Sequence, residues 1–252
     1  MITKRQESIG IKQVIRYEWM QQTTNLLLAG LDAPTIRQEL HEYLADKKGN
    51  GTIGPRSTQT RKFAVGNLMT IWVTPAKELL PFRDAALEMI QEHPKQAAAV
   101  HWSMISAAYP FWFNVARQTG RLLALQQQVT HNQIVKRLKE HYGDRQTVSR
   151  YAQYVIRTFV AWKVLHDTGT MGCYEKANNP RKLDADLAIL MIESALFTMP
   201  DKKCALGLLI NNPAFFPYQL PIMTAEYISE YNKRIIVDYK GFEDDIVSLR
   251  SM

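Results

Sequence analysis

Residues 130 to 176 read THNQIVKRLKEHYGDRQTVSRYAQYVIRTFVAWKVLHDTGTMGCYEK, and their pattern is helix, tight turn, longer helix and short hairpin. Thr130 can cap the first helix, and Gly143 suits the position after it that requires positive φ. GDRQ forms the turn, and Thr147 is predicted to cap the second helix. This order of elements predicts a winged helix-turn-helix.

The second predicted helix, residues 147 to 165, has two different faces. Its apolar stripe repeats at intervals of three and four residues and comprises Val148, Ala152, Val155, Ile156, Phe159 and Val160. The opposite stripe carries Arg150, Gln153, Tyr154 and Arg157, with Ser149 beside it and Arg145 just before the helix. Such donors bind phosphates and base edges in a major groove, and no acidic residue of the helix interrupts them. We predict a double-stranded DNA contact here; the alternative is an ordinary solvated helix face.

The hairpin after Leu165 is the predicted wing. Its turn residues are Thr168, Gly169, Thr170 and Gly172, which lie between short β-prone ends. We expect Lys163, His166 and Lys176 to add phosphate contacts.

A second basic region surrounds the glycine-rich loop KKGNGTIGPR. Its cations are Lys47, Lys48, Arg56, Arg61 and Lys62, and the last two fall in the first turns of a helix that begins near Ser57. Exposed amides at such a helix start favour phosphate, so we predict a secondary DNA contact. Residues 34 to 72 could form a second, degenerate helix-turn-helix, although a helical bundle with a basic loop fits equally well.

Composition predicts a mainly α protein of 252 residues, with helical bundle lobes, a winged helix-turn-helix module and short β-hairpins. We divide it into an N-terminal helical region, 1–95, a winged-helix region, 96–180, and a C-terminal helical region, 181–252, that ends in a hairpin. The formal net charge of +7 favours polyanionic partners. Cys173 and Cys204 are far apart and lack metal-ligand spacing, so we expect no disulfide and no zinc site.

The N-terminus lacks the apolar core of a signal peptide, and we predict a cytoplasmic protein with no membrane partner. Residues 96 to 116 contain no Lys, Arg, Asp or Glu over about the length of a membrane span. Because Pro110 interrupts them, we predict a buried helix that is kinked or stopped there. The neighbouring aromatic residues are predicted to fill the core rather than stack on bases: Tyr109, Phe111, Trp112 and Phe113.

Common catalytic patterns are missing: there is no P-loop, dinucleotide fingerprint, HExxH or CxxC. We therefore predict no enzyme activity, no catalytic residue, no cofactor, no metal site and no small-molecule substrate. One alternative is a metal-dependent nuclease, because Pro200 and Asp201 followed by Asp238 and Lys240 resemble the spacing of nuclease carboxylates and lysine. Asp201 is more simply explained as a helix N-cap. A protein-interaction scaffold is the other alternative.

Three segments and the winged-helix region together resemble the small BrxA-like proteins of BREX phage-defence systems. The segments are NLLLAGLD from residue 25, STQTRKFAVGNL from residue 57 after the basic loop, and ELLPFRDAALEMI from residue 78. The resemblance covers about two thirds of the chain. It implies a non-enzymatic accessory protein that binds double-stranded DNA and works beside other defence-system proteins, and it assigns no individual site residue.

Overall fold

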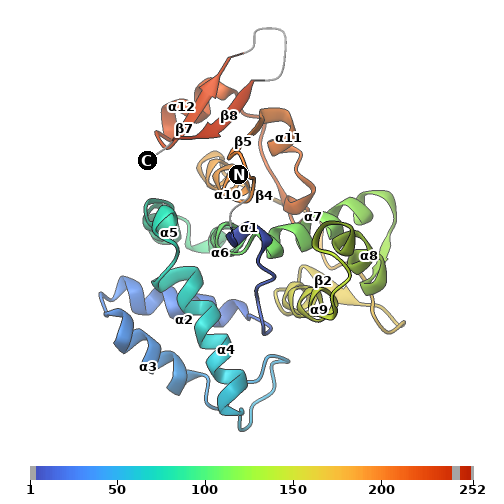
Figure 1. Ribbon diagram of the computed structural model, residues 1–252. Coiled ribbons are helices and arrows are strands. Elements are labelled where there is room, and N and C mark those ends of the chain that lie inside the picture. The colour runs from blue at the N-terminus through green and yellow to red at the C-terminus, as the bar shows by residue number, and fades with distance from the viewer. Residues whose placement is uncertain (1–3, 240–244, 251–252) are drawn as a thin grey trace.

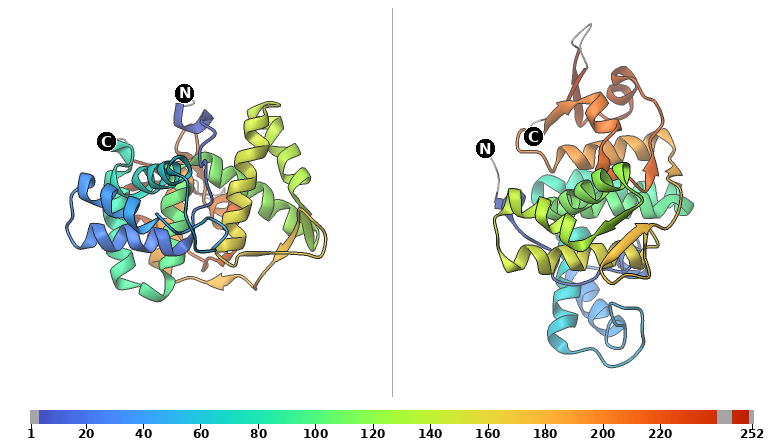
Figure 2. Two further views of the ribbon diagram at one scale, coloured as in Figure 1. Left: turned by 90° about the horizontal axis from the view of Figure 1, so that it is seen from below. Right: turned by 90° about the vertical axis from the view of Figure 1, so that its right-hand side faces the viewer.

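The computed structural model describes residues 4–239 and 245–250. Helices dominate, which confirms the mainly α class. Figure 1 shows α6 and α7 crossing the middle of the molecule, with α2 to α4 below them, α8 and α9 to one side, and the last sheet with α12 above. Figure 2 gives the same order from two further directions.

The N-terminal part comprises α1 (Lys4–Glu7), α2 (Tyr17–Leu28), α3 (Ala33–Tyr43), α4 (Thr58–Leu68) and the π-helical turn η1 (Met69–Val73). Asp32 caps α3 by accepting from the Thr35 amide, and Ser57, near which a helix start was predicted, caps α4 by accepting from the Thr60 amide. No side chain caps the start of α2, whose N-cap residue is Arg16. Residues 8 to 16, which we call the strap, form neither helix nor strand and descend between α4 and α9 (Figure 1).

The central part comprises η2 (Lys77–Leu79), α5 (Leu80–Glu92), η3 (Pro94–Gln96), α6 (Ala97–Ala108) and α7 (Pro110–Leu125). The predicted stop is confirmed, because α6 ends at Ala108 and α7 begins at Pro110. Nearly every α6 side chain is buried, as are Phe111, Trp112 and Phe113, which confirms the aromatic core. None of the helices within the described ranges combines the length and the apolar character that a membrane span needs.

The next part comprises β1 (Gln128–Thr130), α8 (His131–Tyr142), α9 (Gln146–Ala161), β2 (Leu165–Asp167) and β3 (Cys173–Lys176). The predicted helix, turn, helix and hairpin are therefore present. A third strand joins the hairpin, because β1 pairs with β3, and the antiparallel sheet has the order β1-β3-β2. The chain thus leaves the sheet after β1, makes two helices, and returns to it.

The C-terminal part comprises β4 (Arg181–Lys182), α10 (Ala185–Leu196), β5 (Lys203–Ala205), α11 (Leu206–Ile210), η4 (Pro213–Phe215), β6 (Tyr218–Gln219), α12 (Ala225–Tyr231), β7 (Ile235–Asp238) and β8 (Ile246–Leu249). The predicted terminal hairpin is present as β7 and β8, and its predicted turn at Gly241 lies outside the described residues. Asp201 is not the helix N-cap that the sequence suggested, because residues 203–205 form β5 and pair with β8.

One connected hydrophobic core runs from Ile11 to Val247 and includes side chains from all three predicted regions. At its centre Phe159 of α9 stacks on Trp102 of α6, with ring centroids 5.1 Å apart, and meets Trp112 of α7 edge-on at 4.8 Å. Aromatic pairs of this kind add about 1 kcal/mol each beyond burial. The apolar face of α9 is therefore fixed against α6 and α7, which leaves its other face to solvent.

Candidate nucleic-acid interface

The turn between α8 and α9 is held by local hydrogen bonds. Thr130 forms a capping box with Gln133 at the start of α8, and Gly143 ends that helix with a φ of 78°. Arg145 then donates from Nε and a terminal nitrogen to the Tyr142 carbonyl, at 3.0 and 2.8 Å. Both predictions for α8 are confirmed, whereas Arg145 is partly used to close this helix end.

Thr147 does not cap α9, contrary to the prediction. The helix begins one residue earlier, at Gln146, and its N-cap residue is Arg145, whose side chain makes no capping bond. Thr147 is instead an exposed residue of the first turn. No side chain caps this end, and the Val148 amide donates to the Arg145 carbonyl at 3.0 Å, so within the described residues the amides of Gln146 and Thr147 are left for solvent or a ligand.

The outward face of α9 carries its predicted residues with different degrees of exposure. Arg150 is exposed, and its side chain makes no ion pair or hydrogen bond within the described residues. Ser149 and Tyr154 are half-buried, and Gln153 donates weakly to the Tyr174 hydroxyl at 3.4 Å. The apolar stripe is confirmed, since its members are buried apart from the half-buried Val160.

Arg157 is not the free cation that its helix position suggested. Its terminal nitrogen lies 2.5 Å from a carboxylate oxygen of Asp167 in β2, and both side chains remain partly exposed. Burial lowers the pKa of Arg157, but the hydrogen bond and charge of Asp167 outweigh burial and raise it. No acid interrupts the face within α9, as predicted, but the neighbouring strand supplies one. The C-terminal half of the face is therefore close to neutral.

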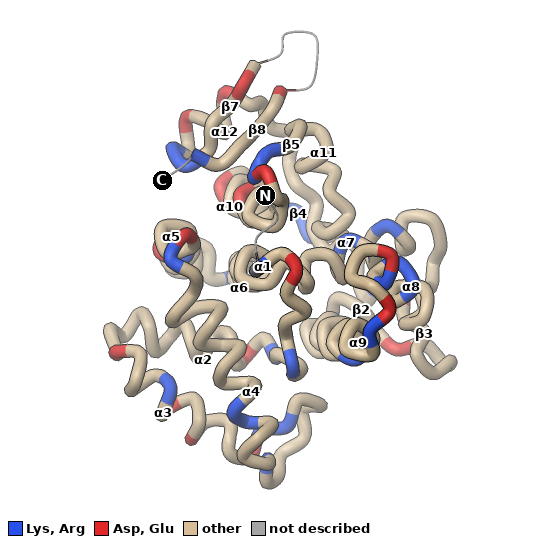
Figure 3. The backbone as a smooth tube through the Cα atoms, in the orientation of Figure 1, with Lys and Arg blue, Asp and Glu red and all other residues tan. Residues whose placement is uncertain are grey.

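The hairpin contributes less positive charge than expected. His166 pairs with Glu175 on the neighbouring strand at 2.5 Å, whereas Lys163 and Lys176 are exposed. Figure 3 shows basic positions of α8 and α9 gathered on one side of the molecule, with acidic positions among them.

The basic loop divides into structural and exposed cations. Arg56 donates to the Lys47 and Thr60 carbonyls and lies over the Trp19 ring, 4.8 Å from its centroid, so it holds the loop together. Lys47 bonds the Tyr43 carbonyl at 2.9 Å. Both side chains make contacts inside the protein, and their part in the DNA contact stays a prediction.

Three cations of this region remain available. Lys48 and Lys62 are exposed and Arg61 is half-buried. Burial lowers the pKa of His41, and the charges of Arg61, Arg37 and Lys62 lower it further. The basic side chains of α3 and α4 therefore create a local positive field.

The strap connects the basic loop to α9. Its Val14 and Arg16 lie against Gly49 and Gly51 of the loop. The Ile15 amide donates to the Thr158 hydroxyl of α9 at 3.1 Å, and the Trp162 indole donates to the Ile15 carbonyl at 2.8 Å. The two predicted contact regions thus touch opposite sides of the same segment.

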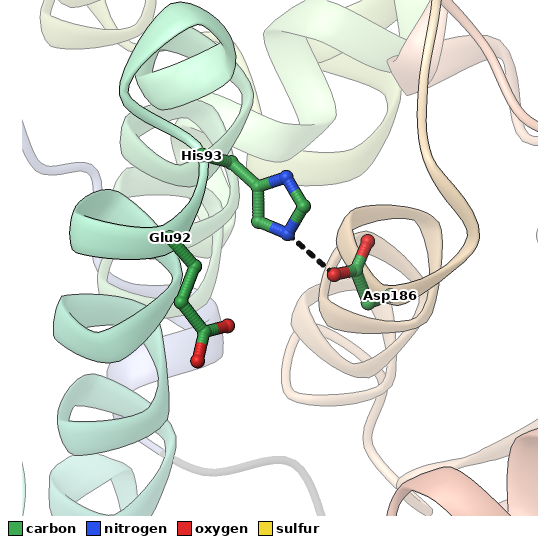
Figure 4. Close-up of side chains that lie close together, drawn as sticks. All are labelled: Glu92, His93 and Asp186. Atoms are coloured by element: carbon green, nitrogen blue, oxygen red, sulfur yellow. Dashed lines mark hydrogen bonds and ion pairs between the residues drawn. The ribbon is translucent and has the colours of Figure 1, made fainter.

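Sequence reasoning missed a cluster between α5 and α10. His93 lies 2.5 Å from Asp186, and Figure 4 shows the two side chains facing each other, with Glu92 beside them. Their ligand-type atoms lie within 4.8 Å of one another. Because His93 and Asp186 are 93 residues apart, no spacing rule could have joined them. In the structure this cluster ties two helices together.

The nuclease alternative is not supported by the positions of its carboxylates. Strand pairing places Asp238 level with Ala205, whereas Asp201 lies beyond the other end of β5, with β8 between the two strands. Because neighbouring strands lie about 4.8 Å apart, β5 and β7 are separated by about 10 Å, and strand pairing does not bring Asp201 and Asp238 together. Lys240 lies outside the described residues.

Comparison of the chain with models of protein families, with curated protein sequences and with solved structures found no match.

Proposed function

We propose that this chain is a non-enzymatic protein that binds double-stranded DNA through a winged helix-turn-helix formed by β1, α8, α9, β2 and β3. In this proposal α9 is the recognition helix and the β2–β3 hairpin is the wing. The order helix, helix, hairpin and the sheet order β1-β3-β2 support it. The resemblance to BrxA-like proteins adds the expectation of an accessory role in a phage-defence system.

The N-terminal half of α9 is the observation that carries the proposal. It combines first-turn amides that no side chain caps, an exposed Thr147 hydroxyl and an exposed Arg150 without a carboxylate partner in the described chain. A helix start of this kind favours phosphate, and an adjacent arginine can bind phosphate or guanine. Because Arg157 is paired with Asp167, we place the contact on this half rather than along the whole helix.

Arg150→Ala tests the proposal directly. We expect duplex affinity to fall by about 1 kcal/mol, roughly fivefold, and the slope of log affinity against log salt to fall by about 1. Fluorescence anisotropy with a labelled 25-base-pair duplex at two or more salt concentrations measures both. The matched control is Lys203→Ala, which removes one exposed positive charge from β5. Equal effects of the two substitutions would reject α9 as the contact.

A protein-interaction scaffold is the second candidate. The observations that favour it are the ion pairs Arg157–Asp167 and His166–Glu175, which reduce the charge of the wing side, and Met171, whose side chain is fully exposed in the hairpin turn. Heparin elution and duplex titration separate the candidates. A scaffold would bind duplex no more tightly than another protein of the same net charge.

A further inference from the structure

A cavity of about 480 Å³ lies at the C-terminal end of α9, outside the proposed DNA contact. Its walls come from the start of α2, Lys95 and Ala98, the end of α9 with the residues after it, and the segments around 176–181 and 216–218. Cavities of about 300–1,000 Å³ are the usual size for small organic ligands. Neither the sequence patterns nor the proposed DNA contact accounts for it.

One wall of the cavity is aromatic. It consists of Tyr17, Trp162, Phe216 and Tyr218, and the indole of Trp162 is fixed by its hydrogen bond to the strap. Tyr17 meets Trp162 edge-on, with centroids 6.0 Å apart. Trp162 is therefore held in place before any ligand arrives, with Tyr17 packed against it.

The cavity walls also carry five cations and a single carboxylate. Glu18 pairs with Arg16, which leaves Lys95, Lys163, Lys176 and Arg181. Within residues 4–239 and 245–250, no carboxylate lies within 4.0 Å of these four side chains. Arg181 of β4 pairs with Tyr218 of β6, which places it beside one of the aromatic residues of the cavity.

Lys163 has a left-handed backbone conformation that is unfavourable for a residue with a side chain. This residue follows α9 with a φ of 56°, a conformation that costs a non-glycine residue about 1 kcal/mol or more. Its carbonyl accepts from Asn178 at 3.1 Å, so the segment is fixed there. Glycine is the residue that this helix end favours, yet a lysine occupies it and adds a cation to the cavity wall.

We propose that this cavity binds a nucleoside phosphate, with the base against the aromatic wall and the phosphates on Lys163, Lys176 and Arg181. Base stacking on aromatic side chains and cations that hold phosphate are the two interactions that such a ligand needs. Inorganic phosphate would leave the aromatic wall unused, and an uncharged aromatic ligand would leave the cations unused. Lys163 and Lys176 were also predicted to contact DNA phosphate, whereas Thr147 and Arg150, which carry the proposed DNA contact on α9, do not line this cavity.

The ligand chemistry has two sources, a free nucleotide or a nucleotide exposed in a DNA strand. Isothermal titration calorimetry and Trp fluorescence quenching with ATP, AMP, adenosine, inorganic phosphate and the oligonucleotide dT4 distinguish them. We expect ATP or AMP to bind at least tenfold more tightly than adenosine or phosphate. Tighter binding of dT4 than of ATP would identify the strand as the source. Failure of ATP, AMP and dT4 to bind more tightly than phosphate overturns the site.

Two variants and one control locate the binding. Lys163→Gly relieves the left-handed backbone, so it should fold at least as stably as the parent while nucleotide affinity falls about tenfold. Arg181→Ala should have a similar effect on affinity, whereas Lys182→Ala, the exposed neighbour outside the cavity wall, should leave affinity unchanged. Equal affinity of K163G, R181A and K182A overturns the site. Arg150→Ala should retain nucleotide binding, so failure of the DNA proposal and failure of this one give different results.

Discussion

Asp167 lowers the net positive charge of the outward face of α9, because its carboxylate pairs with Arg157. Its ion pair with Arg157 is exposed, so it contributes at most about 1 kcal/mol to folding, but it cancels a cation on the proposed DNA face. Asp167→Asn should therefore leave stability nearly unchanged and tighten duplex binding about fivefold, with a salt slope steeper by about 1. Anisotropy titrations measure this change.

The control for that prediction is Asp84→Asn. Asp84 is an exposed acid of α5 that pairs with its neighbour Arg83 at 2.6 Å, so the substitution changes net charge by the same amount at another surface. If both variants tighten binding equally, the effect is one of net charge, and Arg157 is not part of the contact.

His101 makes stability depend on pH. It is fully buried among Tyr17, Trp72 and Trp162, neither ring nitrogen has a partner within the described chain, and burial lowers its pKa to about 3. In the unfolded chain the ring takes a proton near pH 6.5. Between these values the unfolded state binds more protons, so stability is fully present above pH 6.5 and falls as pH decreases.

The expected loss is up to about 1.4 kcal/mol per pH unit below pH 6.5. Between pH 7 and pH 5 the parent should therefore lose about 2 kcal/mol more than His101→Phe, which removes the titrating group and keeps an aromatic ring. Urea unfolding at the two pH values tests this difference. Parallel losses in parent and variant would show that His101 does not titrate as a buried group.

Helix α7 packs on η4 through a glycine. A Cβ on Gly120 would meet the Pro213 carbonyl oxygen at 1.9 Å and Phe216 at 3.1 Å, so backbone would have to move. Alanine normally stabilises a helix by about 0.8–1 kcal/mol relative to glycine. The clash outweighs this gain, and Gly120→Ala should destabilise the protein by at least about 2 kcal/mol.

Gly66 in α4 gives the matched comparison. Nothing lies within 4 Å of a Cβ at this position outside its own helix, so Gly66→Ala should raise stability by about 0.5–1 kcal/mol. The two substitutions are chemically identical and should have opposite signs in thermal or urea unfolding. The same sign for both would show that close approach does not decide the α7–η4 packing.

Local signals predicted most of the elements. Thr130, Asp32 and Ser57 act on amides only a few residues away, and the stripe of α9 repeats within one helix, so the sequence contains all the information needed. The cap of α9 was misplaced because Thr147 and Arg145 are both compatible with a helix start, and helix ends are only marginally specified by sequence. Strand β1 was missed because three residues carry no period of their own.

A buried acid, Glu193, links α10 to the segment that precedes β7. Glu193 of α10 has no exposed surface and accepts from Arg234 at 2.7 and 2.8 Å and from Asn232 at 2.6 Å. Glu193→Met should destabilise the protein by about 3 kcal/mol, because it leaves those donors unpaired. Removing both members of a buried ion pair destabilises a protein less than removing one of them. The double variant Glu193→Met/Arg234→Met should therefore be at least about 1 kcal/mol more stable than Glu193→Met in urea unfolding. A double variant as unstable as the sum of the single ones would contradict a direct coupling.

The candidate site was predictable only in part, because its charges are set by residues distant in sequence. The outward face of α9 follows from helical spacing, but its neutralisation by Asp167 depends on how the hairpin folds back. Arg56 and Lys47 looked like surface cations because their partners are carbonyls and rings, which no composition argument reveals. The cavity beside Lys163 combines five separate segments, so it exists only in the folded molecule.

The strap also has a consequence for the order in which the protein assembles during translation. The hydrogen-bond partners of Ile15 are Thr158 and Trp162, which follow it in the sequence by 143 and 147 residues. Ribosomes add roughly 5–20 residues per second, so this segment stays undocked for on the order of ten seconds, even where α2 to α4 have already packed. The strap therefore packs against α9 late in synthesis. Nascent chains that are stalled before α9 emerges from the ribosome should remain sensitive to protease at residues 8 to 16.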